Sequence, residues 1–94
     1  MNKYKIKPSS QFKKDLKLAQ KRGLKIEKLQ QVVGILASGF TLPEQYHNHP
    51  LKGNYVGCME CHIQPDWLLI YKIKDDELLI TLARTGTHND LFNE

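Results

Sequence analysis

WLLIYKIKDDELLITLAR, at residues 67–84, is the stretch that decides the fold of this chain. It opens with a nearly continuous apolar run over residues 67–73, which is typical of a strand at the centre of a sheet. Asp75-Asp76 then predicts a turn. A second strand is expected over residues 77–84, so the stretch predicts two neighbouring antiparallel strands.

Two more strands complete the expected sheet. Residues 54–63 read as a strand that ends at the Gln64-Pro65 turn, which makes a three-stranded meander with the two strands above. Near the start of the chain, residues 3–7 alternate lysine with Tyr4 and Ile6, which is the pattern of a half-buried strand.

Two helices are expected between the first strand and the meander, at residues 10–22 and 25–38. A Pro-Ser-Ser sequence at residues 8–10 supplies an N-cap, and a glycine follows each helix. Residues 40–53 read as a loop. Each helix has one apolar face, formed by Phe12, Leu16 and Ala19 in the first and by Ile26, Leu29, Val32, Val33 and Leu36 in the second. The order β-α-α-β-β-β predicts one α+β domain over residues 1–94, a helical hairpin packed on an antiparallel sheet.

Composition and charge narrow the class of protein. The chain is 40% hydrophobic and 26% charged, as expected of a soluble globular domain, and a signal peptide is not apparent, so we expect a cytoplasmic protein. Residues 1–28 contain ten Lys or Arg and two acids, whereas residues 29–94 contain four and eight. This basic region is either a solvated helix surface or a docking face for an anionic partner, RNA or an acidic protein segment. Its central lysines are Lys13, Lys14 and Lys17.

The sequence Cys58-x-x-Cys61-His62 has the spacing that attaches a c-type haem. In an extended segment the two thiols would point to opposite faces, whereas haem attachment needs both on one side. A structural zinc site would need four ligands, and a second such pair is absent from the sequence. We therefore expect structural cysteines, and neither a metal nor a cofactor.

Strand connectivity brings polar side chains together at one edge of the sheet. The meander places the end of its first strand, the start of its second and the end of its third side by side. The residues at these points are His62, Asp66, Arg84 and, just beyond, His88. His49 precedes Pro50, which restricts its backbone to extended conformations.

Histidines, a carboxylate and a guanidinium suit RNA cleavage through the 2′-hydroxyl. A base removes the hydroxyl proton, an acid protonates the departing 5′-oxygen, and cations stabilise the phosphorane. Plainer roles are open for each residue: His62 as a surface side chain, Asp66 as a turn residue, Arg84 as a cover for the sheet edge. Trp67 is either a core residue or a platform on which a base stacks.

Three ordered motifs give the chain a family resemblance. They are His49-Pro-Leu-Lys-Gly53, His62-Ile-Gln-Pro-Asp-Trp-Leu-Leu-Ile-Tyr71, and Arg84-Thr-Gly-Thr-His88 followed by Leu91-Phe92. With these motifs the chain resembles the YafQ branch of the RelE/ParE toxin superfamily, the ribosome-dependent mRNA endoribonucleases of type II toxin–antitoxin systems. The match covers essentially the whole chain.

The resemblance implies a RelE-like fold, cleavage of mRNA in the ribosomal A site and neutralisation by a cognate antitoxin. It implies that His49, His62, Asp66 and His88 are catalytic and that Phe92 helps to position the substrate. Lys52, Arg84 and Trp67 complete the candidate substrate-binding residues. We expect His88 to be the acid, Asp66 or His49 the base, and His62 with Arg84 to hold the phosphate. The alternative is a non-enzymatic toxin that binds DNA gyrase, but such superfamily members lack these histidines.

Overall fold

The computed structural model describes residues 2–92. The strands are β1 (Lys5–Pro8), β2 (His49–Pro50), β3 (Met59–Gln64), β4 (Trp67–Lys74) and β5 (Leu79–Gly86). The helices are α1 (Ser10–Lys21), α2 (Ile26–Ala37) and α3 (His88–Phe92), with short 3₁₀ turns at Glu44–Tyr46, Gly53–Tyr55 and Asp75–Glu77. Within residues 2–92 we find no helix long and apolar enough to cross a membrane.

The five strands form one sheet in the order β1-β5-β4-β3-β2. The apolar strand β4 lies at its centre, as predicted, and the turn at Asp75–Glu77 joins it to β5. The predicted α+β class is confirmed, but the sheet is mixed because β1 runs parallel to β5. Two strands joined by a tight turn must be antiparallel, whereas β1 and β5 are separated by most of the chain and can pair in parallel.

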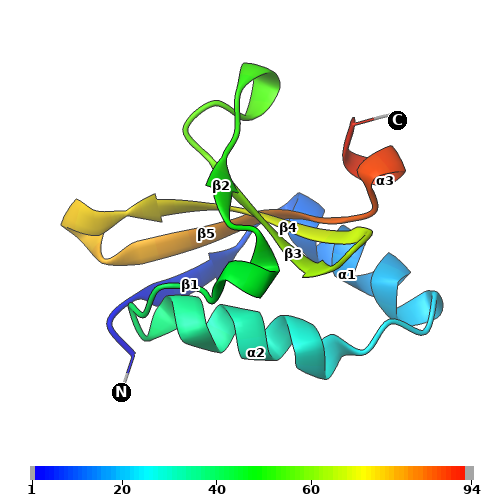
Figure 1. Ribbon diagram of the computed structural model, residues 1–94, viewed down its shortest axis with the longest axis horizontal. Coiled ribbons are helices and arrows are strands. Elements are labelled where there is room, and N and C mark those ends of the chain that lie inside the picture. Colours follow the sequence, from blue (N-terminus) through cyan, green and yellow to red (C-terminus); the bar gives the residue numbers. More distant parts are fainter. Residues whose placement is uncertain (1, 93–94) are drawn as a thin grey trace.

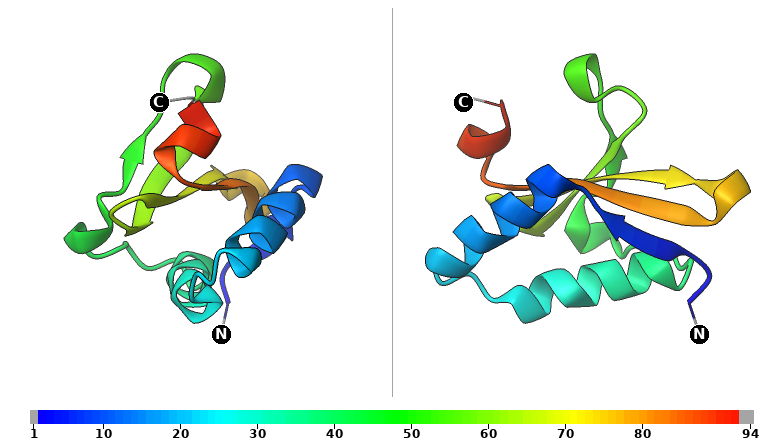
Figure 2. Two further views of the ribbon diagram at one scale, coloured as in Figure 1. Left: turned by 90° about the vertical axis from the view of Figure 1, so that its right-hand side faces the viewer. Right: turned by 180° about the vertical axis from the view of Figure 1, so that it is seen from behind.

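The two long helices cover one face of the sheet (Figure 1; Figure 2). Ser9 caps α1, since its hydroxyl accepts a hydrogen bond from the Phe12 amide at 3.0 Å. The main core lies between helices and sheet and takes in the predicted helix faces. Its fully buried members include Val32, Cys61, Leu69, Tyr71 and Ile80.

The opposite face of the sheet is only partly covered. The turn at Gly53–Tyr55 and α3 both stand on this side, away from α1 and α2 (Figure 2). A smaller apolar cluster ties them to the sheet through Leu68, Ile70 and Leu91, with Tyr55, Cys58 and Phe92 packed against it. Cys58 and Cys61 therefore lie on opposite faces of the sheet, as the sequence predicts.

The strand expected at residues 54–63 begins later, at Met59. Gly53 and Gly57 have φ values of 65° and 88°, a left-handed conformation that turns the chain and excludes an extended segment here. The loop formed by residues 51–58 projects instead from the sheet (Figure 1). Although α3 is distant in sequence, it contacts this loop through the rings of Tyr55 and Phe92.

Candidate active site

Three imidazoles form a row on the open face of the sheet. His62 projects from β3 on this face, because its neighbours Cys61 and Ile63 point into the main core. Its ring centroid lies 6.1 Å from that of His49 and 5.8 Å from that of His88. His62 is thus the central member of the row, and His49 and His88 are its ends.

Asp66 holds His88 at one end of the row. Its Oδ1 accepts a hydrogen bond from the His88 backbone amide at 3.0 Å and lies 2.7 Å from the ring Nδ1. The backbone hydrogen bond first, and then the ring, hold the pKa of Asp66 below its usual value. Because an ionised carboxylate only accepts, Nδ1 carries a proton and Nε2 is left for the substrate. Of the four residues predicted to meet at this edge, His62, Asp66 and His88 lie together in the structure, whereas Arg84 donates to Asp15 on α1.

The first turn of α3 fixes the backbone of His88. The Thr87 amide donates to Asp90 at 3.0 Å, and the Asp90 amide donates to the Thr87 hydroxyl at 3.1 Å. Arg22, at the end of α1, donates to Asp90 at 2.6 Å. Arg22 and the Thr87 amide lower the pKa of Asp90 to about 2. α3 is therefore attached to α1 by a charged contact.

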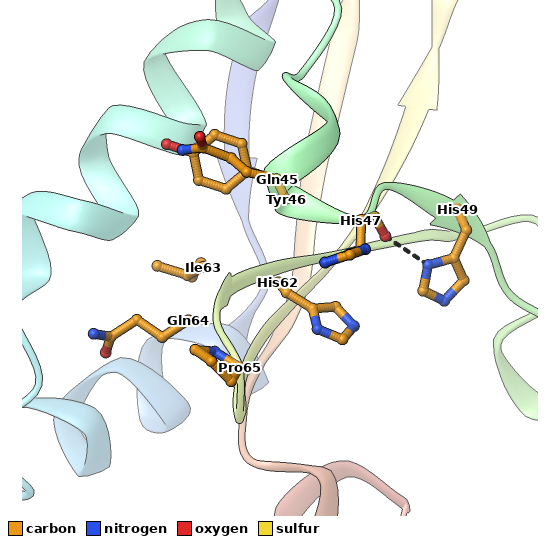
Figure 3. Close-up of a pocket in the computed structure, with 8 residues that line it drawn as sticks. All are labelled: Gln45, Tyr46, His47, His49, His62, Ile63, Gln64 and Pro65. Atoms are coloured by element: carbon orange, nitrogen blue, oxygen red, sulfur yellow. Dashed lines mark hydrogen bonds between the residues drawn. The ribbon is translucent and has the colours of Figure 1, made fainter.

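His49 forms the other end of the row from the short strand β2, which pairs with β3. Its Nδ1 lies 2.7 Å from the His47 carbonyl oxygen, as Figure 3 shows. A carbonyl oxygen only accepts, so Nδ1 is the donor and Nε2 is free to take up a proton. His47 is exposed, and its ring centroid lies 5.4 Å from that of His62, so it belongs to the site.

A groove of about 590 Å³ opens beside the row. Figure 3 shows its lining, which includes His47, His49 and His62 on one side and Gln64 on the other. Imidazole rings, an amide and the apolar surface of Ile63 thus surround a space that adjoins the central histidine. A groove of this size next to acid–base side chains is where a substrate is expected to bind.

Sequence reasoning missed Glu60, a buried carboxylate beneath the row. Glu60 is 4% exposed, and its Oε1 lies 3.3 Å from Nε2 of His49 and 3.4 Å from Nε2 of His62. The sequence does contain a pattern that predicts its position: residues two apart on a strand lie on the same face of the sheet, so Glu60 lies on the face of His62. The pairing of His49 with Glu60 depends on β2, which the sequence did not predict.

Arg84 is held by α1 rather than left free. Its Nε and one terminal nitrogen donate to Asp15 at 2.8 and 3.1 Å, and the Thr85 amide donates to Asp15 at 3.1 Å. Asp15 and then the Tyr55 hydroxyl raise the pKa of Arg84, against the opposite effect of burial. Two nitrogens of the Arg84 guanidinium thus anchor α1 to β5. Only its other terminal nitrogen is available to contact a substrate.

The prediction that Trp67 binds substrate is wrong in this structure. Trp67 is 2% exposed within the main core, and its indole nitrogen donates to the Thr85 hydroxyl at 2.9 Å. The other candidates lie on the surface. Lys52 is exposed in the projecting loop, and Phe92 packs edge-on against Tyr55 with ring centroids 5.7 Å apart. The three α1 lysines, Lys13, Lys14 and Lys17, are all exposed.

A helical hairpin on one face of a five-stranded sheet, with a histidine–carboxylate site on the other, defines a small toxin domain of the RelE-like class. A family model described as "Bacterial toxin of type II toxin-antitoxin system, YafQ" matches residues 4–93. The chain therefore belongs to the YafQ family of bacterial type II toxins.

Relatives of known sequence and structure agree with this assignment. The chain is 44% identical to the mRNA interferase toxin YafQ of Escherichia coli K12 over 88 residues, 93% of this chain and 94% of that protein. It superposes on the toxin of the E. coli DinJ–YafQ toxin–antitoxin complex with a TM-score of 0.87 at 43% identity, covering 96% and 98% of the two chains. A metal-bound toxin from Helicobacter pylori gives a TM-score of 0.88 at 44% identity, with 95% and 99% covered.

Proposed function

We propose that the chain is a single-domain toxin that acts in the cytoplasm as a ribosome-dependent mRNA endoribonuclease and is neutralised by a cognate antitoxin. The row of three imidazoles, with His88 held by Asp66, is the observation that supports the activity. The relatives named mRNA interferase and the DinJ–YafQ complex support the substrate and the partner.

The proposed reaction is transesterification at one phosphodiester. The 2′-oxygen forms a bond to phosphorus as the bond from phosphorus to the 5′-oxygen breaks, which leaves a 2′,3′-cyclic phosphate and a 5′-hydroxyl. The base takes the 2′-hydroxyl proton, and the acid supplies a proton to the 5′-oxygen. Both transfers use protein side chains, and each is typically worth about 10² to 10⁴ in rate.

The positions along the row suggest the division of roles. In-line displacement places base and acid on opposite sides of the phosphorus, which fits the two ends of the row, His49 and His88. Asp66 holds the His88 ring through Nδ1 and leaves Nε2 for the leaving 5′-oxygen, so we assign His88 as the acid. His49 is the base through Nε2, the ring nitrogen that does not contact the His47 carbonyl oxygen. Asp66 is a weaker candidate, because its pKa is lowered and one oxygen is occupied by His88.

The central imidazole is left to contact the phosphate oxygens. His62 lies between the proposed base and acid, about 6 Å from each ring centroid, where the non-bridging oxygens of the phosphorane would lie. Lys52 supplies an exposed cation nearby in the projecting loop, and the lysines of α1 offer a separate surface to ribosomal RNA.

The test is cleavage of a defined mRNA on translating ribosomes by the purified protein. We expect cuts that depend on ribosomes and leave 2′,3′-cyclic phosphate and 5′-hydroxyl ends, and we expect His88→Ala to abolish them. Glu77→Gln, an exposed carboxylate between β4 and β5, is a suitable control. Intact mRNA together with gyrase-dependent DNA damage in expressing cells would support the alternative, a gyrase-binding toxin.

A further inference from the structure

Glu60 is the one carboxylate, among the described residues, that lies between two of the site histidines. Its side chain is 5% exposed, and the same oxygen faces Nε2 of His49 and Nε2 of His62. Isolated ionised carboxylates are rarely buried, because losing their hydration costs several kcal/mol unless a cation or hydrogen-bond donors compensate. The two imidazoles are the groups placed to compensate.

The other neighbours of Glu60 offer no closer cation. Across the sheet Glu60 pairs with Ile70 on β4, and Ile70 pairs with Arg84 on β5, so the guanidinium lies two strands away and donates to Asp15. His47 and His88 contact the ring of His62 rather than the carboxylate. Burial of the adjacent Cys61 thiol, and then the negative charge of Glu60, raise the pKa of that thiol to about 12, so the thiol stays neutral.

The contacts of Glu60 are long for charged hydrogen bonds. Nitrogen to oxygen distances in such bonds are usually about 2.7–2.9 Å, whereas those here are 3.3 and 3.4 Å. The His49 ring already donates through Nδ1 to His47, so a neutral ring presents a bare Nε2 to the carboxylate. The contact becomes attractive once Nε2 gains a proton. Hydrogen bonds of this kind tighten when the reaction supplies that proton.

We propose that Glu60 is a positioning residue for the cleavage reaction, which orients His49 and His62 and stabilises the imidazolium that forms on His49. The inference rests on the proposed function, since it gives His49 the role of base. The carboxylate acts from below the row, while 46% of the His49 side chain stays exposed and open to the substrate. As in a catalytic triad, a buried carboxylate lies beside a histidine proposed to receive a proton, but Glu60 faces the nitrogen that receives it, whereas a triad carboxylate contacts the other ring nitrogen.

The experiment compares Glu60→Gln, Glu60→Asp and the control Glu77→Gln with the unchanged protein. Glutamine keeps the size of the side chain and removes the charge, whereas aspartate keeps the charge on a shorter stem. We expect E60Q to lower kcat by about 10- to 100-fold with little change in KM, the same range as for removing the carboxylate partner of a metal-bound histidine. E60D should recover part of this loss, and E77Q should behave as the unchanged protein.

Two readouts separate this role from a purely structural one. Without the carboxylate the proposed base binds its proton less tightly, so the acid-side limb of the pH–rate profile should move to lower pH in E60Q. Nitrogen-15 NMR of the histidine rings at a fixed pH should show less doubly protonated His49 and His62 in E60Q than in E60D. This second measurement needs no catalytic activity.

The outcomes distinguish the two hypotheses. An active unchanged protein whose E60Q variant has the same kcat, pH profile and ring spectra would overturn the role of Glu60 and leave the proposed function intact. Equal losses in E60Q and E60D, with unchanged ring protonation in both, would also overturn it, since Glu60 would then only pack. An unchanged protein that cuts no mRNA contradicts the proposed function, and the ring spectra still test Glu60.

Discussion

Replacing Asp15 by alanine should destabilise the whole domain, although Asp15 lies on a helix outside the row of imidazoles. Asp15 is 8% exposed and accepts four hydrogen bonds, two from Arg84, one from the Thr85 amide and one from the Gln11 side-chain amide. In the Asp15→Ala variant the buried Thr85 amide loses its partner, which costs about 1–3 kcal/mol. The Arg84 side chain is 25% exposed, so its screened ion pair adds about 1 kcal/mol.

The expected loss is therefore about 2–4 kcal/mol in the free energy of unfolding, a large part of the roughly 5–15 kcal/mol typical of a domain. For a chain of this length, each kcal/mol lowers Tm by about 4–8 °C, so Tm should fall by roughly 10–30 °C. Asp15→Asn should lose less, because its amide oxygen still accepts from Thr85. Asp76→Ala, in the exposed turn before β5, should change stability little.

Urea unfolding followed by tryptophan fluorescence is a direct assay, because Trp67 is the sole tryptophan and is buried in the main core. A loss below about 0.5 kcal/mol in Asp15→Ala, comparable with an ordinary surface substitution, would refute the reasoning. It would mean that Arg84 is not held by α1 in solution, and Arg84 would again be available to bind phosphate.

Four further predictions follow from the site and its surroundings. Asp66→Asn should reduce cleavage about 10²- to 10⁴-fold, and adding it to His88→Ala should cause no further loss, because Asp66 acts through His88; additive losses in single-turnover kinetics would contradict this. Cleavage should survive a strong metal chelator, and activity lost on chelation and restored by zinc alone would point to metal catalysis. Acidification should loosen α3, because the ionised Asp90 holds it: the pKa of Asp90 is lowered to about 2, so its stabilising effect is complete above pH 4 and is lost as the pH falls towards 2. Hydrogen exchange of the α3 amides would measure this loss, and Asp90→Asn should abolish the pH dependence. Changing the three exposed lysines of α1, Lys13, Lys14 and Lys17, to glutamate should slow antitoxin association and weaken ribosome binding, both in a salt-dependent way. Unchanged association rates and ribosome affinity across a salt series would show that these lysines form only a solvated surface.

The elements that the sequence predicts well are those with a long, regular pattern. The helices over 10–22 and 25–38 lie within one residue of α1 and α2 at each end, because the 3.6-residue period of their apolar faces is repeated three times. The central position of β4 follows from its apolar run. The short elements β2 and α3 were missed, since two and five residues carry no periodicity and depend on tertiary partners such as Arg22.

The site residues likewise fall into those that the sequence predicts and those that depend on tertiary pairing. Strand connectivity alone brought His62, Asp66 and His88 together, and the structure shows them in contact range. Glu60 was missed because its role depends on pairing between β2 and β3. The error over Trp67 was avoidable, because the alternation along β4 places it on the same face as Leu69 and Tyr71, both members of the main core.

The parallel pairing of β1 with β5 has a consequence for the synthesis of this protein. The sheet joins the first strand to the last, and Asp15 meets Arg84 across 69 positions of the sequence. Contacts so distant in sequence cannot form on a partly translated chain, whatever its local propensities. His88, at one end of the row of imidazoles, follows β5, the last strand among the described residues. A nascent chain therefore cannot assemble the sheet or the row of imidazoles until β5 and α3 have left the ribosome, because both contribute residues that the earlier segments need as partners.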